Sequence, residues 1–170
     1  MLDIAKLQAM GVEDSRKTRF DLGEELSDVL ITFEQKIYNK HLDVRVDLPD
    51  KPVWTRAERD SITQVIYNLI DNAVKFSNDD SVIYIETLQK REKIFVSVKD
   101  TGLGIRQDSL PKIWERFYKT DLSRGKDKKG TGLGLAIVKE IIQAHGENIN
   151  VVSTEGVGTE FTFTLQSAGK

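Results

Sequence analysis

The sequence predicts an α/β sandwich in which helices cover one face of a β-sheet, and three observations support this fold class. Segments with apolar residues at helical spacing occur in turn with segments in which apolar and polar residues alternate one by one. A length of 170 residues suits a single domain, and 39% apolar with 31% charged residues is typical of a soluble globular protein. The order helix, strands, helix, strands, helix, strands favours one layer of helices packed on one sheet.

Residues 1–19 precede the predicted domain. Residues 2–10 carry an apolar helical face that is too short to fold alone, so we interpret them as the end of a longer helix that stops at Gly11. The polar residues 11–19 are interpreted as a linker. The domain itself is predicted to extend from residue 20 to residue 167, and a short tail follows at 168–170.

The first helix of the domain is predicted to begin at Asp21, which has capping-box spacing with Glu24. Its apolar residues recur at helical spacing as far as Ile37. Alternating apolar and polar residues predict a strand over 42–48, and residues 53–54 are expected to form a short second strand.

The second helix is predicted from Thr55 to about Phe76, because Thr55 and Glu58 have the spacing of another capping box. Its apolar stripe consists of Ile62, Val65, Ile66, Leu69, Ile70 and Ala73. Period-two alternation predicts four more strands, at 82–88, 94–98, 149–153 and 159–165. A short helix over 110–117 and a clearer one over 133–145, which ends at Gly146, lie between these strand pairs.

The composition excludes several functional classes. The absence of cysteine rules out zinc ribbons, iron–sulfur clusters, thiol nucleophiles and disulfide scaffolds. The 25 basic and 27 acidic residues give a net charge of −2, which argues against a nucleic-acid binder. No apolar run approaches the ~20 residues of a membrane helix, and the N-terminus does not have the pattern of a secretion signal. A cytoplasmic domain is therefore predicted.

Glycines are concentrated in one part of the chain. Six of the 12 glycines fall within residues 102–134, and the last of them form the pattern Gly-Thr-Gly-Leu-Gly directly before a helix. Such a segment directs free backbone amides and a helix N-terminus at one point, which favours phosphate binding. A flexible surface loop is the alternative that glycine clustering leaves open. The lysine of the P-loop and the spacing of the dinucleotide-binding fingerprint are both missing, so a nucleotide site must be of another kind.

A polar row on the second helix is another indication of a ligand. Asn68 and Asn72 lie four residues apart and project from one face, which Lys75 shares. Polar groups interleaved with an apolar stripe are costly unless they bind something. Amide oxygens suit Mg²⁺ and a lysine suits phosphate. A solvent-facing polar row is the alternative interpretation.

Four segments resemble, in order and in spacing, the sequence boxes of sensor histidine kinases. Residues 68–77 (NLIDNAVKFS) are similar to the N box, 100–105 (DTGLGI) to the G1 box, 114–119 (WERFYK) to the F box and 130–137 (GTGLGLAI) to the G2 box. The resemblance covers roughly residues 20–165, and the combination of all four boxes is highly specific. Residues 2–10 resemble the end of the second dimerisation helix of the family.

The resemblance implies a Bergerat ATP-binding fold, an α+β fold with a mixed, mostly antiparallel sheet that three helices cover on one face. It implies a catalytic domain that binds ATP with Mg²⁺ and transfers the γ-phosphoryl group to a histidine on a dimerisation domain, for relay to a response regulator. In the family, that histidine is followed by an acidic residue, a pattern that neither His41 nor His145 meets. We therefore expect a monomeric chain that lacks its own phosphoacceptor, from a homodimeric parent protein anchored in the bacterial inner membrane.

The resemblance also implies roles for individual residues. Asn72 would be the principal Mg²⁺ ligand with Asn68 assisting, and Lys75 would contact the phosphates. Phe76 would lie against the adenine or the ribose. Asp100 would accept a hydrogen bond from the adenine amino group, because an ionised carboxylate can only accept.

The remaining roles are implied in the same way. Gly102 and Gly104 would give the chain room beside the base, Ile105 would form an apolar wall, and Thr159 would reach adenine through water. The other ATP-binding positions are Tyr118, Lys119, Gly130, Thr131, Gly132, Leu133 and Gly134. Residues 106–129 would form a lid, which Trp114, Phe117 and Tyr118 would anchor on the core.

Three other functions compete with this interpretation. An ATP hydrolase of the same superfamily would carry, at the position of Asn68, a glutamate that activates water as general base, and an amide cannot accept that proton. A serine kinase of the anti-sigma type shares the fold but usually lacks an F box. The third alternative is a degenerate kinase that only holds nucleotide, against which the intact N, G1 and G2 boxes argue.

Overall fold

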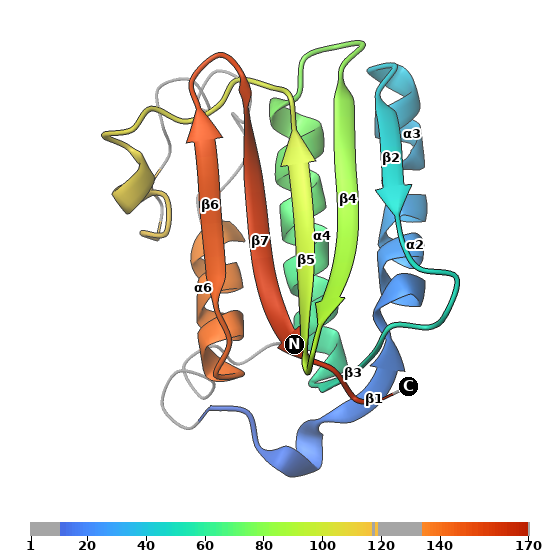
Figure 1. The fold of residues 1–170 in the computed structure, drawn as a ribbon. Coiled ribbons are helices and arrows are strands. Elements are labelled where there is room, and N and C mark those ends of the chain that lie inside the picture. Colours follow the sequence, from blue (N-terminus) through green and yellow to red (C-terminus); the bar gives the residue numbers. More distant parts are fainter. Residues whose placement is uncertain (1–10, 117, 119–133, 170) are drawn as a thin grey trace.

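The computed structural model describes residues 11–116, 118 and 134–169 of the chain. A five-stranded sheet has the spatial order β2-β4-β5-β7-β6, and helices cover its rear face in Figure 1. The strands are β2 (Asp43–Asp47), β4 (Val82–Lys90), β5 (Lys93–Asp100), β6 (Ile149–Thr154) and β7 (Gly158–Gln166). The helices are α2 (Leu22–Thr32), α3 (Glu34–Asn39), α4 (Arg59–Phe76) and α6 (Gly134–Ala144). Strand β2 is parallel to β4 and the other neighbours are antiparallel, so the predicted mixed, mostly antiparallel sheet with helices on one face is confirmed.

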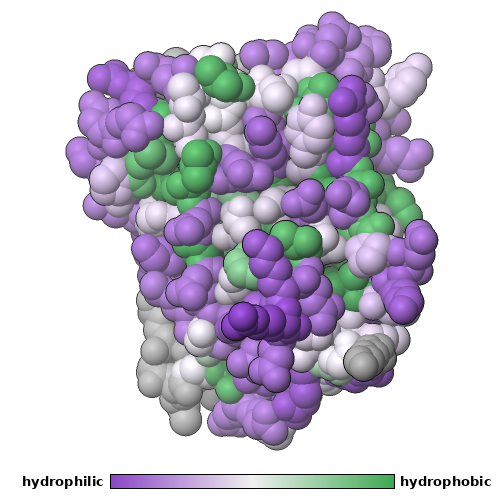
Figure 2. Space-filling view, viewed as in Figure 1, coloured by the Kyte–Doolittle hydropathy of each residue, from purple (hydrophilic) through white to green (hydrophobic). Residues whose placement is uncertain are grey.

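The core lies between the sheet and the helix layer. Every second residue of β5 and of β7 is buried, and all six residues of the apolar stripe predicted on α4 are buried as well. The opposite face of the sheet, which faces the viewer in Figure 2, mixes polar with apolar side chains, and Tyr84, Leu88 and Val152 are exposed large apolar residues of its strands. The period-two pattern of the strands therefore separates a buried face from an open one.

Two predictions about the helices are wrong in detail. The first helix is not continuous to Ile37, because Phe33 leaves helical geometry and separates α2 from α3. The helix α4 does not begin at Thr55: this residue lies in strand β3 (Trp54–Ala57), and its hydroxyl donates to the Gln166 carbonyl. The cap is Glu58, whose carboxylate accepts from the backbone N–H of Ser61. Thr55 therefore has the spacing of a capping box but belongs to strand β3, because its partners lie in segments that are distant in the sequence.

Two further segments, the predicted linker over 11–19 and the predicted helix over 110–117, differ from the sequence-based expectation. Within residues 11–19, a short 3₁₀ helix covers Asp14–Arg16, and strand β1 (Thr18–Asp21) pairs antiparallel with β3. The helix expected over 110–117 is reduced to a 3₁₀ turn at Leu110–Lys112 in the described residues. Strand β1 depends on its pairing with β3, a segment that is distant in the sequence.

The predicted N-cap at Asp21 is confirmed, and its carboxylate also ties two segments together. One oxygen of Asp21 accepts from the N–H of Gly23 at 2.9 Å and from the N–H of Val53 at 2.9 Å. We expect Asp21→Ala to lower the free energy of unfolding by about 2 kcal/mol, because a cap is lost and the N–H of the buried Val53 loses its acceptor. Urea unfolding measures this loss. Asp21→Asn keeps the accepting oxygen and should lose less than half as much; equal losses would contradict the role of that oxygen.

Candidate nucleotide-binding site

The end of α4 and the loop after β5 meet at van der Waals contact of their backbones. The N–H of Leu103 donates to the carbonyl of Phe76 at 3.2 Å. A Cβ atom on Gly102 would lie 2.0 Å from that same carbonyl oxygen, a distance that no side chain can occupy. Gly102 is therefore required where the N-box segment and the G1-box segment touch.

The other side of this loop rests on the turn between β6 and β7. Gly104 has a φ of +72°, and a Cβ on it would lie 2.1 Å from the Thr154 carbonyl oxygen. The N–H of Gly156 donates to the carbonyl of Leu103 at 2.7 Å. The two glycines of the G1 segment thus permit close backbone packing on both sides of the loop. This requirement is independent of any room that they leave beside a base.

Asp100 ends β5 at this junction and is 7% exposed. Its carboxylate accepts from the N–H of Gly102 at 2.9 Å. Burial raises the pKa of Asp100 from 3.8 to about 6, although backbone N–H groups of Gly102 and Thr159 act in the opposite direction. At neutral pH the carboxylate is ionised, so it is a buried acceptor that can take a hydrogen bond from a ligand amine.

A pair of hydroxyls lies beside Asp100. Thr159 is directly opposite Asp100 in the β5–β7 pairing, and its hydroxyl is 2.8 Å from the hydroxyl of Ser153. Ser153 also bonds the Gly158 carbonyl at 3.0 Å and accepts from the N–H of Ile105 at 2.7 Å. If Ser153 uses its one hydrogen on that carbonyl, Thr159 is the donor between the two hydroxyls.

Sequence reasoning selected Thr159 and Ile105 but missed Ser153, which connects them. The signal for Ser153 is its place in β6: the pairing of β6 with β7 puts Ile149, Val151 and Ser153 opposite inward-facing residues. A serine at such a position needs hydrogen-bond partners, and it finds them in the G1 loop.

The polar residues of α4 differ in how they are bonded. Asn68 is held between two groups, since its amide nitrogen donates to the Gly134 carbonyl at 3.1 Å and its oxygen accepts from Gln64 at 2.8 Å. Lys75 pairs with Asp71 at 2.9 Å. The Asn72 amide, which is only partly exposed, makes no hydrogen bond to the residues that the structure describes. Of the predicted Mg²⁺ ligands, Asn72 is therefore available and Asn68 connects α4 to the start of α6.

The residues present fit a Mg²⁺ ion only as part of a larger complex. In the part of the chain that the structure describes, no group of three or more His, Asp or Glu side chains could hold a metal ion. An octahedral Mg²⁺ commonly takes one or two protein oxygens and completes its shell with phosphates and water. The Asn72 amide can supply such an oxygen.

Several predicted site residues lie outside the described part of the chain. These are Lys119, Gly130, Thr131, Gly132 and Leu133. Gly134 is described and begins α6 beside Asn68. Tyr118 is half-buried, and its hydroxyl lies 3.3 Å from that of Ser109.

Trp114, at the start of the predicted lid, packs on the core, and Phe117 is not among the described residues. The Trp114 ring packs edge-on against Phe161 of β7, with 5.8 Å between the ring centres. Arg116 forms an ion pair at 2.9 Å with Glu140 of α6. The start of the predicted lid is thus fixed to both β7 and α6.

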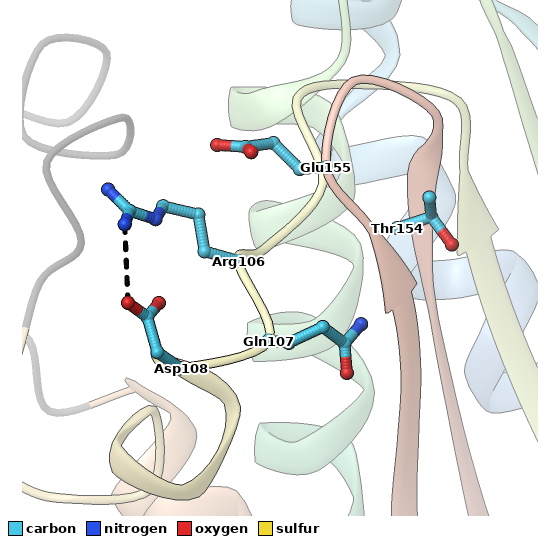
Figure 3. A pocket seen from close by; sticks show the side chains of 5 residues that line it. All are labelled: Arg106, Gln107, Asp108, Thr154 and Glu155. Carbon is cyan, nitrogen blue, oxygen red and sulfur yellow. Dashed lines mark hydrogen bonds and ion pairs between the residues drawn. The ribbon is translucent and has the colours of Figure 1, made fainter.

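A surface pocket of about 490 Å³ lies at the outer side of the turn between β6 and β7. Figure 3 shows its lining residues, which are Arg106, Gln107, Asp108, Thr154 and Glu155. The only ion pair drawn there joins Arg106 to Asp108 at 3.2 Å. None of the predicted ATP-binding residues lines this pocket; those that the structure describes lie mainly on α4, around Asp100 at the end of β5 and at the start of α6.

Comparisons with known proteins identify the family that has this fold. Residues 57–169 match the family described as histidine kinase-, DNA gyrase B- and HSP90-like ATPase. The sensor histidine kinase WalK of Bacillus subtilis is 42% identical over 128 residues, which are 74% of this chain but 21% of WalK. The chain thus spans about a fifth of that relative's length.

Solved structures agree with this family. The catalytic domain of histidine kinase ThkA has a TM-score of 0.78 and 32% identity, covering 89% of this chain and 97% of that domain. ThkA in complex with the response regulator TrrA has a TM-score of 0.75 and 28% identity, covering 89% of this chain and 42% of that one. ShkA in complex with AMPPNP has a TM-score of 0.80 and 28% identity, covering 98% of this chain and 35% of ShkA. The chain belongs to the histidine kinase-like ATPase family, and it has the fold of a sensor histidine kinase catalytic domain.

Proposed function

We propose that this chain binds ATP with Mg²⁺ and provides the γ-phosphoryl group for a histidine on a dimerisation domain, from which the group passes to a response regulator. The contact between Phe76 and Gly102 carries the proposal, because it brings the polar face of α4 next to the buried Asp100 carboxylate. The AMPPNP held by ShkA and the response regulator bound by ThkA support the ligand and the partner.

The roles proposed for the residues follow from their chemistry. Asp100 accepts a hydrogen bond from the adenine amino group, and Thr159 lies beside it to reach the base through water. Lys75, which pairs with Asp71 in the structure, contacts the phosphates when nucleotide binds. The N-terminus of α6 at Gly134 favours negative charge nearby. Asn72 supplies an oxygen for Mg²⁺, which when bound neutralises phosphate charge.

The bonding of Asn68 supports transfer to a protein acceptor rather than to water. A hydrolase needs a general base to activate water, whereas Asn68 is an amide whose nitrogen and oxygen are occupied by Gly134 and Gln64. This arrangement disfavours the competing ATP hydrolase. It leaves the phosphoryl group for an acceptor that another domain brings.

Neither histidine of the chain suits the acceptor role. In His145, one ring nitrogen lies 2.8 Å from the Ile141 carbonyl and the other accepts from the N–H of Glu58 at 3.2 Å. Burial lowers the pKa of His145, and because both ring nitrogens are bonded within the fold, neither is directed toward a nucleotide. His41 lies in a turn with a φ of +54°. The bonding of His145 and the lack of an acidic residue directly after either histidine support a phosphoacceptor on a separate dimerisation domain.

The wider organisation of the parent protein stays a prediction. The division into 1–19, 20–167 and 168–170 stays a prediction. Strand β1 begins at Thr18, two residues before the predicted start of the domain, and the N–H of Ala168, in the predicted tail, donates to the Trp54 carbonyl. Among the described helices, none is long and apolar enough to cross a membrane. The monomeric state of the chain, the homodimer of the parent and its inner-membrane anchor are open to direct measurement.

A phosphotransfer assay tests the proposed function. The chain is mixed with the dimerisation domain of ThkA or WalK and with ATP labelled on its γ-phosphate, and the products are separated. Acid-labile label on the dimerisation domain supports the kinase. Free phosphate without protein label would favour the hydrolase. If nucleotide binds but neither labelled protein nor free phosphate appears, the result would favour the degenerate kinase that only holds nucleotide.

Asn72→Asp is expected to weaken the binding of Mg-ATP about tenfold or more, with little change in stability. The two side chains have nearly the same shape, but the new carboxylate repels the triphosphate and loses the amide donor. Calorimetry with Mg-ATP measures the affinity. Asn150→Asp makes the same change at an exposed position of β6 and should bind like the unmodified chain. Equal affinity in a folded Asn72→Asp variant would remove Asn72 from the site.

A further inference from the structure

Lys40 connects the end of α3 to the end of α4, although it lies outside all four sequence boxes. It is the C-cap residue of α3, and its ammonium group donates to three backbone carbonyls at the C-terminus of α4. The acceptors are Val74 at 2.7 Å, Lys75 at 3.0 Å and Ser77 at 3.0 Å. Its own carbonyl accepts from the N–H of Asp80 at 2.9 Å, so the segment is held from both sides.

This contact completes the hydrogen bonding at the end of α4. A helix leaves its last carbonyls without partners inside the helix. Here the N–H and hydroxyl of Ser77 bond the Ala73 carbonyl, Lys40 bonds those of Val74 and Lys75, and the N–H of Leu103 bonds that of Phe76. The ammonium group has three donors for three carbonyls, and its charge is favourable at a helix C-terminus.

The turn that Lys40 binds is also the turn that meets the G1 loop. It contains Lys75 and Phe76, and the Phe76 carbonyl lies against Gly102 and Leu103. A fraying of this last turn would therefore move both the proposed phosphate-binding lysine and the contact that aligns α4 with Asp100.

We propose that Lys40 is a positioning residue of the nucleotide site, which fixes the last turn of α4 against the G1 loop without touching the nucleotide. This inference rests on the proposed function. Without the ammonium group, the three carbonyls lose their common donor and the turn is no longer fixed. Because the turn carries groups for both ends of the nucleotide, the affinity for ATP, ADP and AMP should fall together.

The test compares Lys40→Met, which keeps the length of the side chain but removes its donors, with Lys51→Met. Lys51 is exposed in the loop before β3, and the second variant makes the same change in charge. Calorimetry gives the nucleotide affinities at a temperature at which all variants are folded. Hydrogen exchange gives the protection of the Leu103 amide, whose acceptor is the Phe76 carbonyl.

A chemical rescue distinguishes positioning from general destabilisation. The chain contains no cysteine, so Lys40→Cys introduces a single thiol, which 2-bromoethylamine converts into a lysine analogue with the ammonium group restored. A loss that is only due to stability would lower the urea midpoint and leave the affinity of the folded protein unchanged. Should Lys40→Met not fold, Lys40→Gln serves in the same comparison.

We expect Lys40→Met to bind all three nucleotides about tenfold more weakly or worse and to exchange the Leu103 amide faster. Lys51→Met should match the unmodified chain, and the alkylated Lys40→Cys should recover most of the affinity. Unchanged affinity and unchanged Leu103 exchange in Lys40→Met would overturn the inference. If the unmodified chain binds no nucleotide, the proposed function fails, and the Leu103 exchange alone then decides whether Lys40 fixes this turn.

Discussion

Asp100→Asn is expected to weaken the binding of adenine nucleotides by about tenfold or more while making the ligand-free domain more stable at pH 7. An asparagine that keeps its oxygen toward the N–H of Gly102 turns its NH₂ group toward the ligand, where a donor would meet the donor of adenine. A hydrogen bond to a charged group contributes about 1.5–3 kcal/mol, so its replacement by a repulsive contact is costly.

The gain in stability follows from the sign of the pKa change. Burial raises the pKa of Asp100 to about 6 from 3.8, so between these values the folded protein binds more protons than the unfolded chain. The free energy of unfolding therefore falls as the pH rises through this range. At pH 7 the buried charge lowers the free energy of unfolding by about 3 kcal/mol. Asp100→Asn removes this loss, and the burial of its neutral amide offsets part of the gain.

Urea unfolding at several pH values and calorimetry with ATP check both effects. The unmodified chain should lose stability between about pH 4 and pH 6 from this group, whereas Asp100→Asn should lack that contribution. As the pH is lowered below about 6, the affinity of the unmodified chain for ATP should decrease. ATP itself also titrates, and the Asp100→Asn variant measures that contribution, so the decrease in the unmodified chain should be larger than the decrease in the variant. Asp50→Asn, at an exposed loop position, is the matched control. A variant that is less stable at every pH and binds ATP normally would refute this account of Asp100.

Gly102→Ala is expected to have the second large effect. It should lower the free energy of unfolding by several kcal/mol and should also abolish nucleotide binding. Its Cβ would lie 2.0 Å from the Phe76 carbonyl oxygen and 2.9 Å from the Cα of Ser77. Both atoms belong to the backbone, so no side chain can turn away to relieve the overlap. Overpacking of a close contact costs about 1–3 kcal/mol and sometimes more, and here it also separates α4 from the G1 loop.

Gly134→Ala is the matched control for folding. The nearest atoms to a Cβ there are those of the Asn68 side chain at 3.9 Å, which is ordinary contact. Because Gly134 lies in α6, alanine should be neutral or stabilising by up to about 1 kcal/mol. Chemical unfolding of both variants measures the difference. Similar stabilities would mean that the backbones of Phe76 and Gly102 do not need this close approach.

Much of the fold was predictable because periodicity is a local property of the chain. The apolar stripe of α4 and the alternation in β7 follow from side-chain geometry within each element. The four boxes, with Asn72 and Asp100 in them, could also be recognised from residue types and spacing. The same local reasoning selected Asp21 correctly as a helix cap.

The same local reasoning was wrong about Thr55, because the rival partner of that residue, Gln166, lies at the other end of the chain. It also missed β1, a four-residue strand with Phe20 as its single apolar residue, which is too short to show an alternating pattern and pairs with β3.

By itself, the sequence thus determined most of the helices and strands and which residue types a ligand could use. Only the tertiary structure decided how these segments are joined at the site. The reasons that Gly102 must be glycine, that Ser153 bonds the G1 loop and that Lys40 closes the end of α4 all lie in segments distant along the chain. Such contacts depend on the topology that brings the segments together, because hydrogen bonds and backbone overlaps form between whatever groups become neighbours in space.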